Sequence, residues 1–188
     1  MALKIRYNAP VVLTFSLICT AIFFIDRPSG GALTNEWFTL HANFSLARPG
    51  DWLTIFSYVI GHANIQHLLG NLTFILLLGP ILEEKYGSRN LLIMMALTAL
   101  ITGVLNLALF DTGVLGASGI VFMFIILVSF SNVSQGEIPL TFILVLILFV
   151  GKEVLMIMEN DQVSQFGHIL GGICGSIFGF LGSGNKNA

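Results

Sequence analysis

The stretch Leu115–Phe122, LGASGIVF, places small residues on either side of a serine, directly before an apolar run. Small residues let two membrane helices approach to close backbone distance, so this stretch is typical of a tightly packed helix start. The serine, Ser118, is either one more packing residue or a nucleophile held inside a membrane. The rest of the chain must decide between these two interpretations.

The composition of the whole chain is that of a membrane protein. Of its 188 residues, 55% are hydrophobic and 10% are charged, with a mean hydropathy of +0.90, whereas soluble domains carry about 25% charged residues. Uncharged stretches of 19, 31, 21, 25 and 24 residues follow Arg6, Asp51, Arg89, Asp111 and Asp161. Because a membrane helix needs about 20 mainly apolar residues, we predict an all-α polytopic membrane protein. The net charge of -2, with no basic patch, argues against nucleic acid as a partner.

We predict six spans in a single membrane domain that covers residues 1–188. The spans are approximately 10–25, 63–82, 91–110, 117–132, 138–157 and 167–183. All are expected to be helical, because the bilayer core offers backbone groups no water to bond. The connection over 26–64 is far longer than most helix connections and is rich in large apolar residues. We expect it to pack on the protein or to lie in the interfacial layer, where tryptophan is favoured.

Charges in the connecting segments indicate the orientation. Five lysines and arginines fall on the side that holds both termini and three on the other side, which favours cytoplasmic termini. The first apolar run lacks a small-x-small cleavage pattern after it, so we predict an uncleaved helix and not a secretory signal. Cys19 and Cys174 both lie in apolar runs and are expected to be buried thiols, with neither a disulfide framework nor a metal pair.

Polar residues within the predicted spans are functional candidates, because such residues are costly in a membrane. His67 and Asn71 are four residues apart and therefore share one helix face. His62 is five residues before His67, so it points elsewhere or lies off the helix. The pair His67 and Asn71 alone is equally typical of a polar clamp between helices.

The last predicted span carries a stripe of small residues that complements the opening stretch. His168 begins it, followed at four-residue intervals by Gly171, Gly175 and Gly179. Packing of this stripe against GASG would bring His168 to Ser118 on the extracytoplasmic side. A histidine that takes the serine proton activates the hydroxyl as a nucleophile, and donors such as His67, Asn71 and the Ser118 amide would stabilise an oxyanion. The combination predicts acyl-transfer chemistry.

Each residue also has a simpler interpretation. A serine between glycines is commonly a packing residue, and a single membrane histidine is commonly a hydrogen-bonded structural residue. The three histidines His62, His67 and His168 are also conceivable metal ligands. However, an i, i+5 pair fits one helix face poorly, and no cysteine or carboxylate lies beside them. The occurrence of all these features at matching depth favours the catalytic interpretation.

The chain resembles the rhomboid family of intramembrane serine proteases. HANIQHLLGN (62–71), GASG (116–119) and HILGGICG (168–175) match the family patterns H-x4-H-x3-N, G-x-S-G and H-x2-G-x3-G, in the family's order. LEEKYGS (82–88) resembles the acidic-Gly turn of the family and places Glu83 at its structural glutamate. The resemblance covers roughly Trp52 to Leu181.

This resemblance implies a six-helix rhomboid-like bundle with a long, half-submerged first loop and no cofactor or metal. It implies Ser118 as nucleophile and His168 as general base. The implied oxyanion hole consists of His67, Asn71 and the Ser118 amide, with Gly116 shaping the turn. His62 would support the first loop. The fifth span and the following loop would form a lateral gate. The expected substrates are single-span membrane proteins, cleaved near the membrane boundary. The short tails favour a minimal bacterial type in the plasma membrane, of unspecified oligomeric state.

Two positions depart from the family pattern. The first loop reads Trp52-Leu53 where the family usually has Trp-Arg, and Phe122 stands where a tyrosine often stacks on the base. Neither change removes a catalytic group, so we expect an active enzyme. The alternatives are a catalytically inactive rhomboid-like protein that binds membrane helices, and a small transporter. Inactive relatives have usually lost the serine or the histidine, and both are present here. A transporter should carry acidic residues inside its spans, whereas all ten acidic residues of this chain fall in loops or at span ends.

Overall fold

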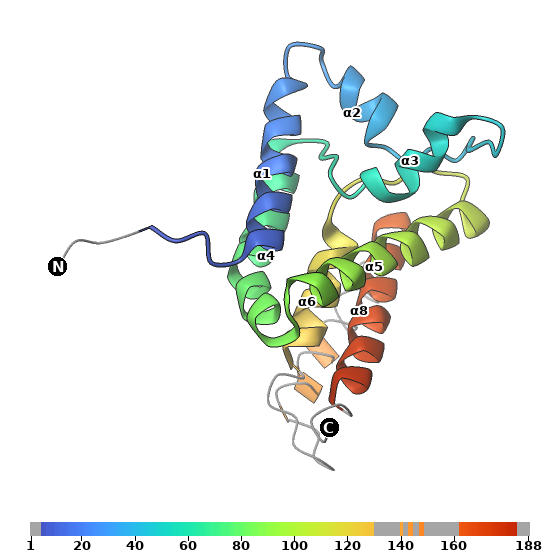
Figure 1. Ribbon diagram of the computed structural model, residues 1–188. Helices are drawn as coiled ribbons and strands as arrows, with labels where there is room; N and C mark the ends of the chain where they lie inside the picture. Colours follow the sequence, from blue (N-terminus) through green and yellow to red (C-terminus); the bar gives the residue numbers. More distant parts are fainter. Residues whose placement is uncertain (1–4, 130–139, 141–142, 145–146, 149–161, 184–188) are drawn as a thin grey trace.

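The computed structural model describes residues 5–129, 140, 143–144, 147–148 and 162–183 (Figure 1). The helices in this part of the chain are α1 (Pro10–Ile25), α2 (Ala32–Trp37), α3 (Pro49–Ser57), α4 (Ile65–Tyr86), α5 (Ser88–Leu109), α6 (Ser118–Ser129) and α8 (Gln162–Ser183). The β-structure assigned among the described residues is one isolated bridge, between Leu40 and Val114. The described chain is therefore all-helical.

The predicted spans 10–25, 63–82, 91–110, 117–132 and 167–183 fall on α1, α4, α5, α6 and α8, with boundaries shifted by a few residues. Most of the predicted span 138–157 lies outside the described residues. Three helices, α4, α5 and the 165–182 part of α8, are long and apolar enough to cross a membrane, and α1 and α6 are shorter apolar helices. The short helices α2 and α3, within the connection 26–64, were not predicted.

Helix α6 occupies the centre of the bundle and packs against α8, α4 and α5 (Figure 1). Its sequence is apolar all round, as expected for a buried helix. Six of its side chains are buried: Ile120, Val121, Met123, Phe124, Ile126 and Leu127. By contrast, α4 and α5 leave large apolar side chains exposed along their lengths, including Phe74, Leu77, Leu92 and Leu97. The apolar outer surface is suited to a lipid solvent and not to water.

Glycines bring α6 and α8 to backbone contact. A Cβ atom on Gly171 would overlap the carbonyl oxygen of Gly119, and one on Gly175 would lie 2.5 Å from the carbonyl oxygen of Met123. Any larger side chain at either position would force the two helices apart. The predicted packing of the small-residue stripe against the opening stretch is therefore confirmed for Gly171, which meets Gly119, whereas Gly175 packs further along α6, against Met123 and Ile126.

The carboxylate of Glu83, on α4, fixes the beginning of α1. Helix α1 has no side-chain cap of its own, so its first amide groups need another acceptor. The Val11 amide donates to Glu83 Oε1 (2.9 Å) and the Val12 amide to Oε2 (3.0 Å), while the Ser88 hydroxyl donates to Oε1 (2.7 Å). Glu83 is only 5% exposed. These contacts tie α1 to α4 and to the first turn of α5.

We expect Glu83→Gln to destabilise the fold by about 1–3 kcal/mol, because one backbone amide of α1 would then face an NH₂ group in place of an oxygen. Glu84→Gln, which neutralises the neighbouring exposed carboxylate, is the matched control and should have little effect. Thermal unfolding of the purified protein in detergent measures both changes. Equal unfolding temperatures for the two variants would contradict this assignment.

Candidate active site

Ser118 lies at the first position of α6, where backbone amides are free. The first intrahelical bond at this end runs from the Val121 amide to the Ala117 carbonyl (3.0 Å). The amides of Ser118, Gly119 and Ile120 consequently have no acceptor within the helix. The Ser118 side chain is half-buried and lines a cavity. A hydroxyl and a free amide N–H of the same residue are thus available at one point.

The turn before Ser118 depends on Gly116. Its φ of +113° is a conformation that favours glycine, and its amide donates to the Tyr58 carbonyl (2.9 Å). A Cβ atom on Gly116 would lie 2.5 Å from Nε2 of His67 and 3.7 Å from Nδ2 of Asn71. Gly116 is therefore small because the His67 ring lies against its backbone. The expectation that Gly116 admits the last helix was wrong, since it faces α4.

A cavity of about 170 Å³ opens beside Ser118 and joins residues from several helices. Its walls are formed by Tyr58, His67, Thr102, Gly113, Val114, Leu115, Gly116, Ser118, Gly119 and Gly167. Tyr58 and Thr102 were not among the predicted site residues. A threonine within an apolar span commonly bonds its own helix backbone, so only the tertiary arrangement reveals that Thr102 lines the same cavity as Ser118.

The ring of His168 lies on Phe122. The two ring centroids are 4.1 Å apart, with an interplanar angle of 35°. Phe122 is four residues after Ser118, so both lie on one face of α6. Gly167, the residue before His168, lines the cavity with Ser118. Helix α8 therefore holds His168 over the face of α6 that begins with the serine.

His62 lies off helix α4, which was one of the two alternatives, yet its ring contacts the residues on that helix. Its Nδ1 is 2.9 Å from the Ile60 carbonyl oxygen and its Nε2 is 3.0 Å from Nδ2 of Asn71. Because a carbonyl only accepts, Nδ1 carries the proton and Nε2 accepts from the Asn71 amide. The His62 ring is also 5.0 Å from that of His67, edge to face.

A comparison of the sequence with known protein families gives a clear match. The Rhomboid domain family model matches residues 49–185, which is well over half of the chain. The chain belongs to the rhomboid family. With the apolar helices α4, α5 and α8, it is an integral membrane protein of that family.

Several bacterial rhomboids are similar to this chain. YdcA of Bacillus subtilis, which bears a rhomboid protease name, is 29% identical over 178 residues, covering 90% of this chain and 85% of YdcA. The rhomboid protease GlpG of Klebsiella pneumoniae (strain 342) is 29% identical over 119 residues, 63% of this chain and 42% of GlpG. The rhomboid protease GlpG of Haemophilus influenzae is 25% identical over 130 residues, 68% of each chain. The chain thus spans less than half the length of the Klebsiella protein.

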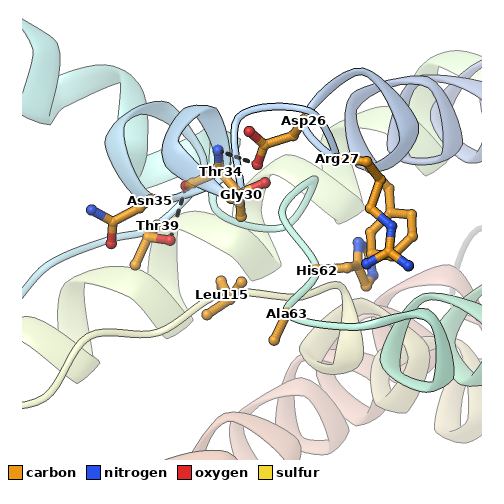
Figure 2. A pocket seen from close by; sticks show the side chains of 11 residues that line it. Asp26, Arg27, Gly30, Thr34, Asn35, Thr39, His62, Ala63 and Leu115 are labelled. Carbon is orange, nitrogen blue, oxygen red and sulfur yellow. Dashed lines mark hydrogen bonds between the residues drawn. The ribbon is translucent and has the colours of Figure 1, made fainter.

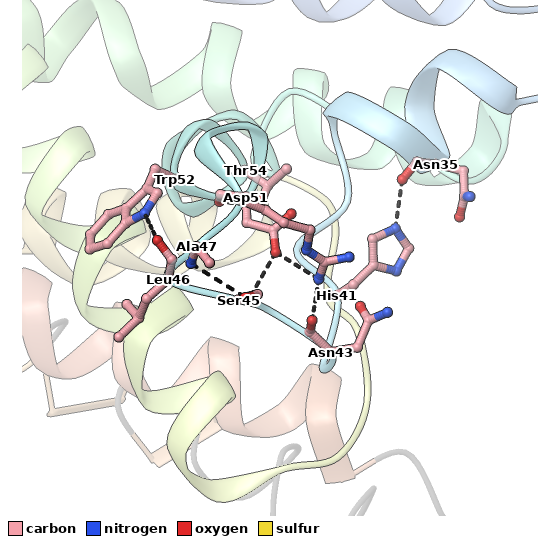
Figure 3. Close-up of polar contacts among 10 residues, drawn as sticks. Asn35, His41, Asn43, Ser45, Leu46, Ala47, Asp51, Trp52 and Thr54 are labelled. Carbon is pink, nitrogen blue, oxygen red and sulfur yellow. Dashed lines mark hydrogen bonds and ion pairs between the residues drawn. The ribbon is translucent and has the colours of Figure 1, made fainter.

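An arginine is present in the first loop of this rhomboid, although not next to the tryptophan. The guanidinium of Arg48 donates to the Asn43 carbonyl and pairs with Asp51 at 2.8 Å. Trp52 donates from its indole nitrogen to the Leu46 carbonyl (3.2 Å; Figure 3). Hydrogen bonds and an ion pair within residues 43–52 therefore hold the loop before α3 together. Leu53 cannot make such contacts at the position of the usual arginine, but Arg48 makes them from the other side of Trp52.

The metal-site alternative gains no support from the part of the chain that the structure describes. No group of three or more histidine, cysteine or acidic side chains within it is arranged to hold a metal ion. Cys19 and Cys174 are buried free thiols.

We expect His62 to remain neutral at physiological pH. Burial and the neighbouring His67 lower its pKa from 6.5 to about 4, against a smaller opposing effect of the hydrogen bond to Ile60. As the pH falls, His62 therefore takes up a proton in the unfolded chain at a higher pH than in the folded protein. The contribution of His62 to the free energy of unfolding is therefore greatest above about pH 6.5, and it decreases as the pH falls from 6.5 toward 4.

Histidine NMR signals, assigned with His62→Gln, should show His62 as the Nδ1–H tautomer with a titration midpoint near pH 4. Asn71→Ala should raise that midpoint, because Nε2 would lose its donor. A midpoint near 6.5 in the unaltered protein would contradict the buried hydrogen-bonded arrangement.

Proposed function

We propose that this rhomboid is an intramembrane serine endopeptidase that cleaves membrane helices near the membrane boundary. The observation that carries the proposal is the meeting of three chain segments, from α4, α6 and α8, at one end of the bundle. Ser118 begins α6, His168 lies on Phe122 one turn further along, and His67 with Asn71 lies against Gly116. These are the residue types and positions that acyl transfer requires.

In the proposed mechanism, Nε2 or Nδ1 of neutral His168 takes the proton of the Ser118 hydroxyl as its oxygen attacks the scissile carbonyl carbon. The carbonyl oxygen becomes an oxyanion and accepts hydrogen bonds from the His67 ring, the Asn71 amide and the Ser118 N–H. Collapse of this intermediate breaks the C–N bond, and the leaving amine takes the proton from His168. Water then hydrolyses the acyl-enzyme by the same route, with His168 again as base, and restores Ser118.

Asn71 suits this role because His62 fixes the direction of its amide. With Nε2 of His62 accepting from Nδ2 of Asn71, the NH₂ group and not the oxygen faces His62 and the Gly116 turn. A donor already oriented before reaction costs no reorganisation when charge develops. His62 is therefore proposed as a positioning residue, in addition to supporting the first loop.

The proposed setting is the bilayer of a bacterial plasma membrane, with cytoplasmic termini and single-span membrane proteins as substrates. Its support is the bacterial origin of the similar rhomboid proteases and the apolar outer surface of α4 and α5. We further propose a single six-helix domain, a first loop that lies partly in the membrane interface, and catalysis by protein side chains alone.

Ser118→Ala and His168→Ala are each expected to abolish cleavage of a model single-span substrate by the purified protein in vesicles. A fluorophosphonate probe should label the unaltered protein at Ser118 and should not label either variant. Cleavage that persists in either variant would refute the mechanism. A protein that binds the substrate helix but neither cuts it nor reacts with the probe would be the inactive, helix-binding alternative.

A double-mutant cycle tests the coupling of His62 to Asn71. We expect Asn71→Ala to lower kcat by about 10- to 1000-fold and His62→Ala to lower it less. In the double variant the two losses should not add, because His62 acts through Asn71. His41→Ala is the matched histidine control, since His41 contacts the Asn35 carbonyl outside the site, and its effect should be independent of Asn71. Additive losses for His62 and Asn71 would contradict the positioning role.

A further inference from the structure

A second cavity, of about 370 Å³, lies between the end of α1, helix α2 and the segment before α4 (Figure 2). We refer to it as the α1–α2 cavity. Its polar lining includes Asp26, Arg27, Thr34, Asn35 and His62. None of these residues except His62 takes part in the chemistry proposed above.

The α1–α2 cavity borders the proposed reaction site. Leu115, the residue before the Gly116 turn, lines both this cavity and the smaller one that contains Ser118. His62 lines the α1–α2 cavity and bonds Asn71 through Nε2. A polypeptide whose cleaved bond lies at Ser118 therefore has this cavity next to it. An extended chain advances by about 3.3 Å per residue, so a side chain a few residues from the cleaved bond reaches it.

The negative charge in the cavity wall, the carboxylate of Asp26, already has hydrogen-bond donors within the protein. Asp26 is buried, and its carboxylate accepts from the amides of Leu33 (2.9 Å) and Thr34 (2.8 Å) and from the Ser29 hydroxyl. Burial acts to raise the pKa of Asp26, but these hydrogen bonds outweigh it and hold the pKa at about 2. Asp26 therefore fixes the beginning of α2 and has little capacity to bind a ligand.

The positive charge in the cavity wall, the guanidinium of Arg27, is available to bind a ligand. Arg27 is exposed, and its guanidinium carbon lies 5.2 Å from the centroid of the Phe23 ring. Its side chain has no ion pair or hydrogen bond with other described residues, and Figure 2 shows it pointing away from Asp26. The aromatic contact limits its motion without using its N–H donors. A guanidinium held in this way matches the two oxygens of a carboxylate.

We propose that the α1–α2 cavity is a substrate subsite that selects an acidic side chain close to the cleaved bond, with Arg27 as the residue that recognises it. Asn35, which lines the cavity on the side away from Arg27, adds a neutral polar side chain to the lining (Figure 2). The inference rests on the proposed protease function and specifies one feature of its substrates. The shared wall with the Ser118 cavity favours a substrate carboxylate over the phosphate of a lipid headgroup as the occupant.

The test uses single-span model substrates in vesicles of neutral phospholipid. One glutamate is moved through the positions on either side of the cleaved bond, and each substrate has a glutamine twin. At one or two positions, glutamate should raise kcat/KM by about 10-fold over glutamine, chiefly through KM, since hydrogen bonds between charged groups are the stronger class. Arg27→Gln should remove this ratio and Arg27→Lys should retain part of it.

Arg48→Gln is the matched control, because it removes a cation from the same loop but outside the cavity, and it should leave the ratio unchanged. The comparison of glutamate with glutamine in the unaltered protein needs no variant, so poor folding of an Arg27 variant does not block the test. Equal rates at every position, or a ratio that survives Arg27→Gln, would overturn the subsite. Failure to cleave any substrate would instead overturn the protease function.

A third outcome identifies the lipid alternative. In that case no substrate position would show a preference for glutamate over glutamine. Arg27→Gln would lower the cleavage rate of every substrate by the same factor, and only in vesicles that contain an anionic phospholipid. That pattern would assign Arg27 to a headgroup phosphate and would also overturn the subsite.

Discussion

The close approach of α6 and α8 is the constraint on which the rest of the structure depends. In a bilayer, helices gain little from burying apolar surface, because lipid tails are as apolar as leucine, so tight packing must supply the attraction. Gly171 and Gly175 remove the side chains that would separate α8 from the backbone of α6 at Gly119 and Met123. The same contact sets the distance between Ser118 and the helix that carries His168. Stability of the bundle and geometry of the site therefore depend on one set of glycines.

The first loop extends this constraint to the turn before Ser118. Leu40 and Val114 exchange two backbone hydrogen bonds (3.0 and 2.9 Å), and the Gly116 amide donates to the Tyr58 carbonyl. The Leu40 side chain is fully buried and lies against Gly103 on α5. The loop thus contributes backbone acceptors and donors to the segment that bends at Gly116. The long connection is therefore part of the support for the turn before Ser118.

Sequence patterns predicted the helices and the candidate site to different depths. Apolar runs located α1, α4, α5, α6 and α8, because length and hydrophobicity alone define a membrane helix. Motif spacing selected Ser118, His168, His67 and Asn71 as candidates, and the fold brings them to one end of the bundle. It did not predict α2 or α3, whose short helices depend on contacts such as those of Asp26 with the beginning of α2. Nor did it predict that Thr102 and Tyr58 line the cavity, since only tertiary packing selects them.

The role of His62 shows why helical periodicity was a poor guide at this point. Five residues separate it from His67, a spacing that directs two side chains apart on a continuous helix. However, α4 begins only at Ile65, and the Asn64 side chain caps it by accepting from the His67 amide (2.8 Å). The chain before that cap is free to fold back, so the His62 ring returns to Asn71. A buried acceptor for a buried amide avoids the cost of an unpaired polar group in an apolar interior. The requirement to satisfy Asn71 therefore explains the position of His62.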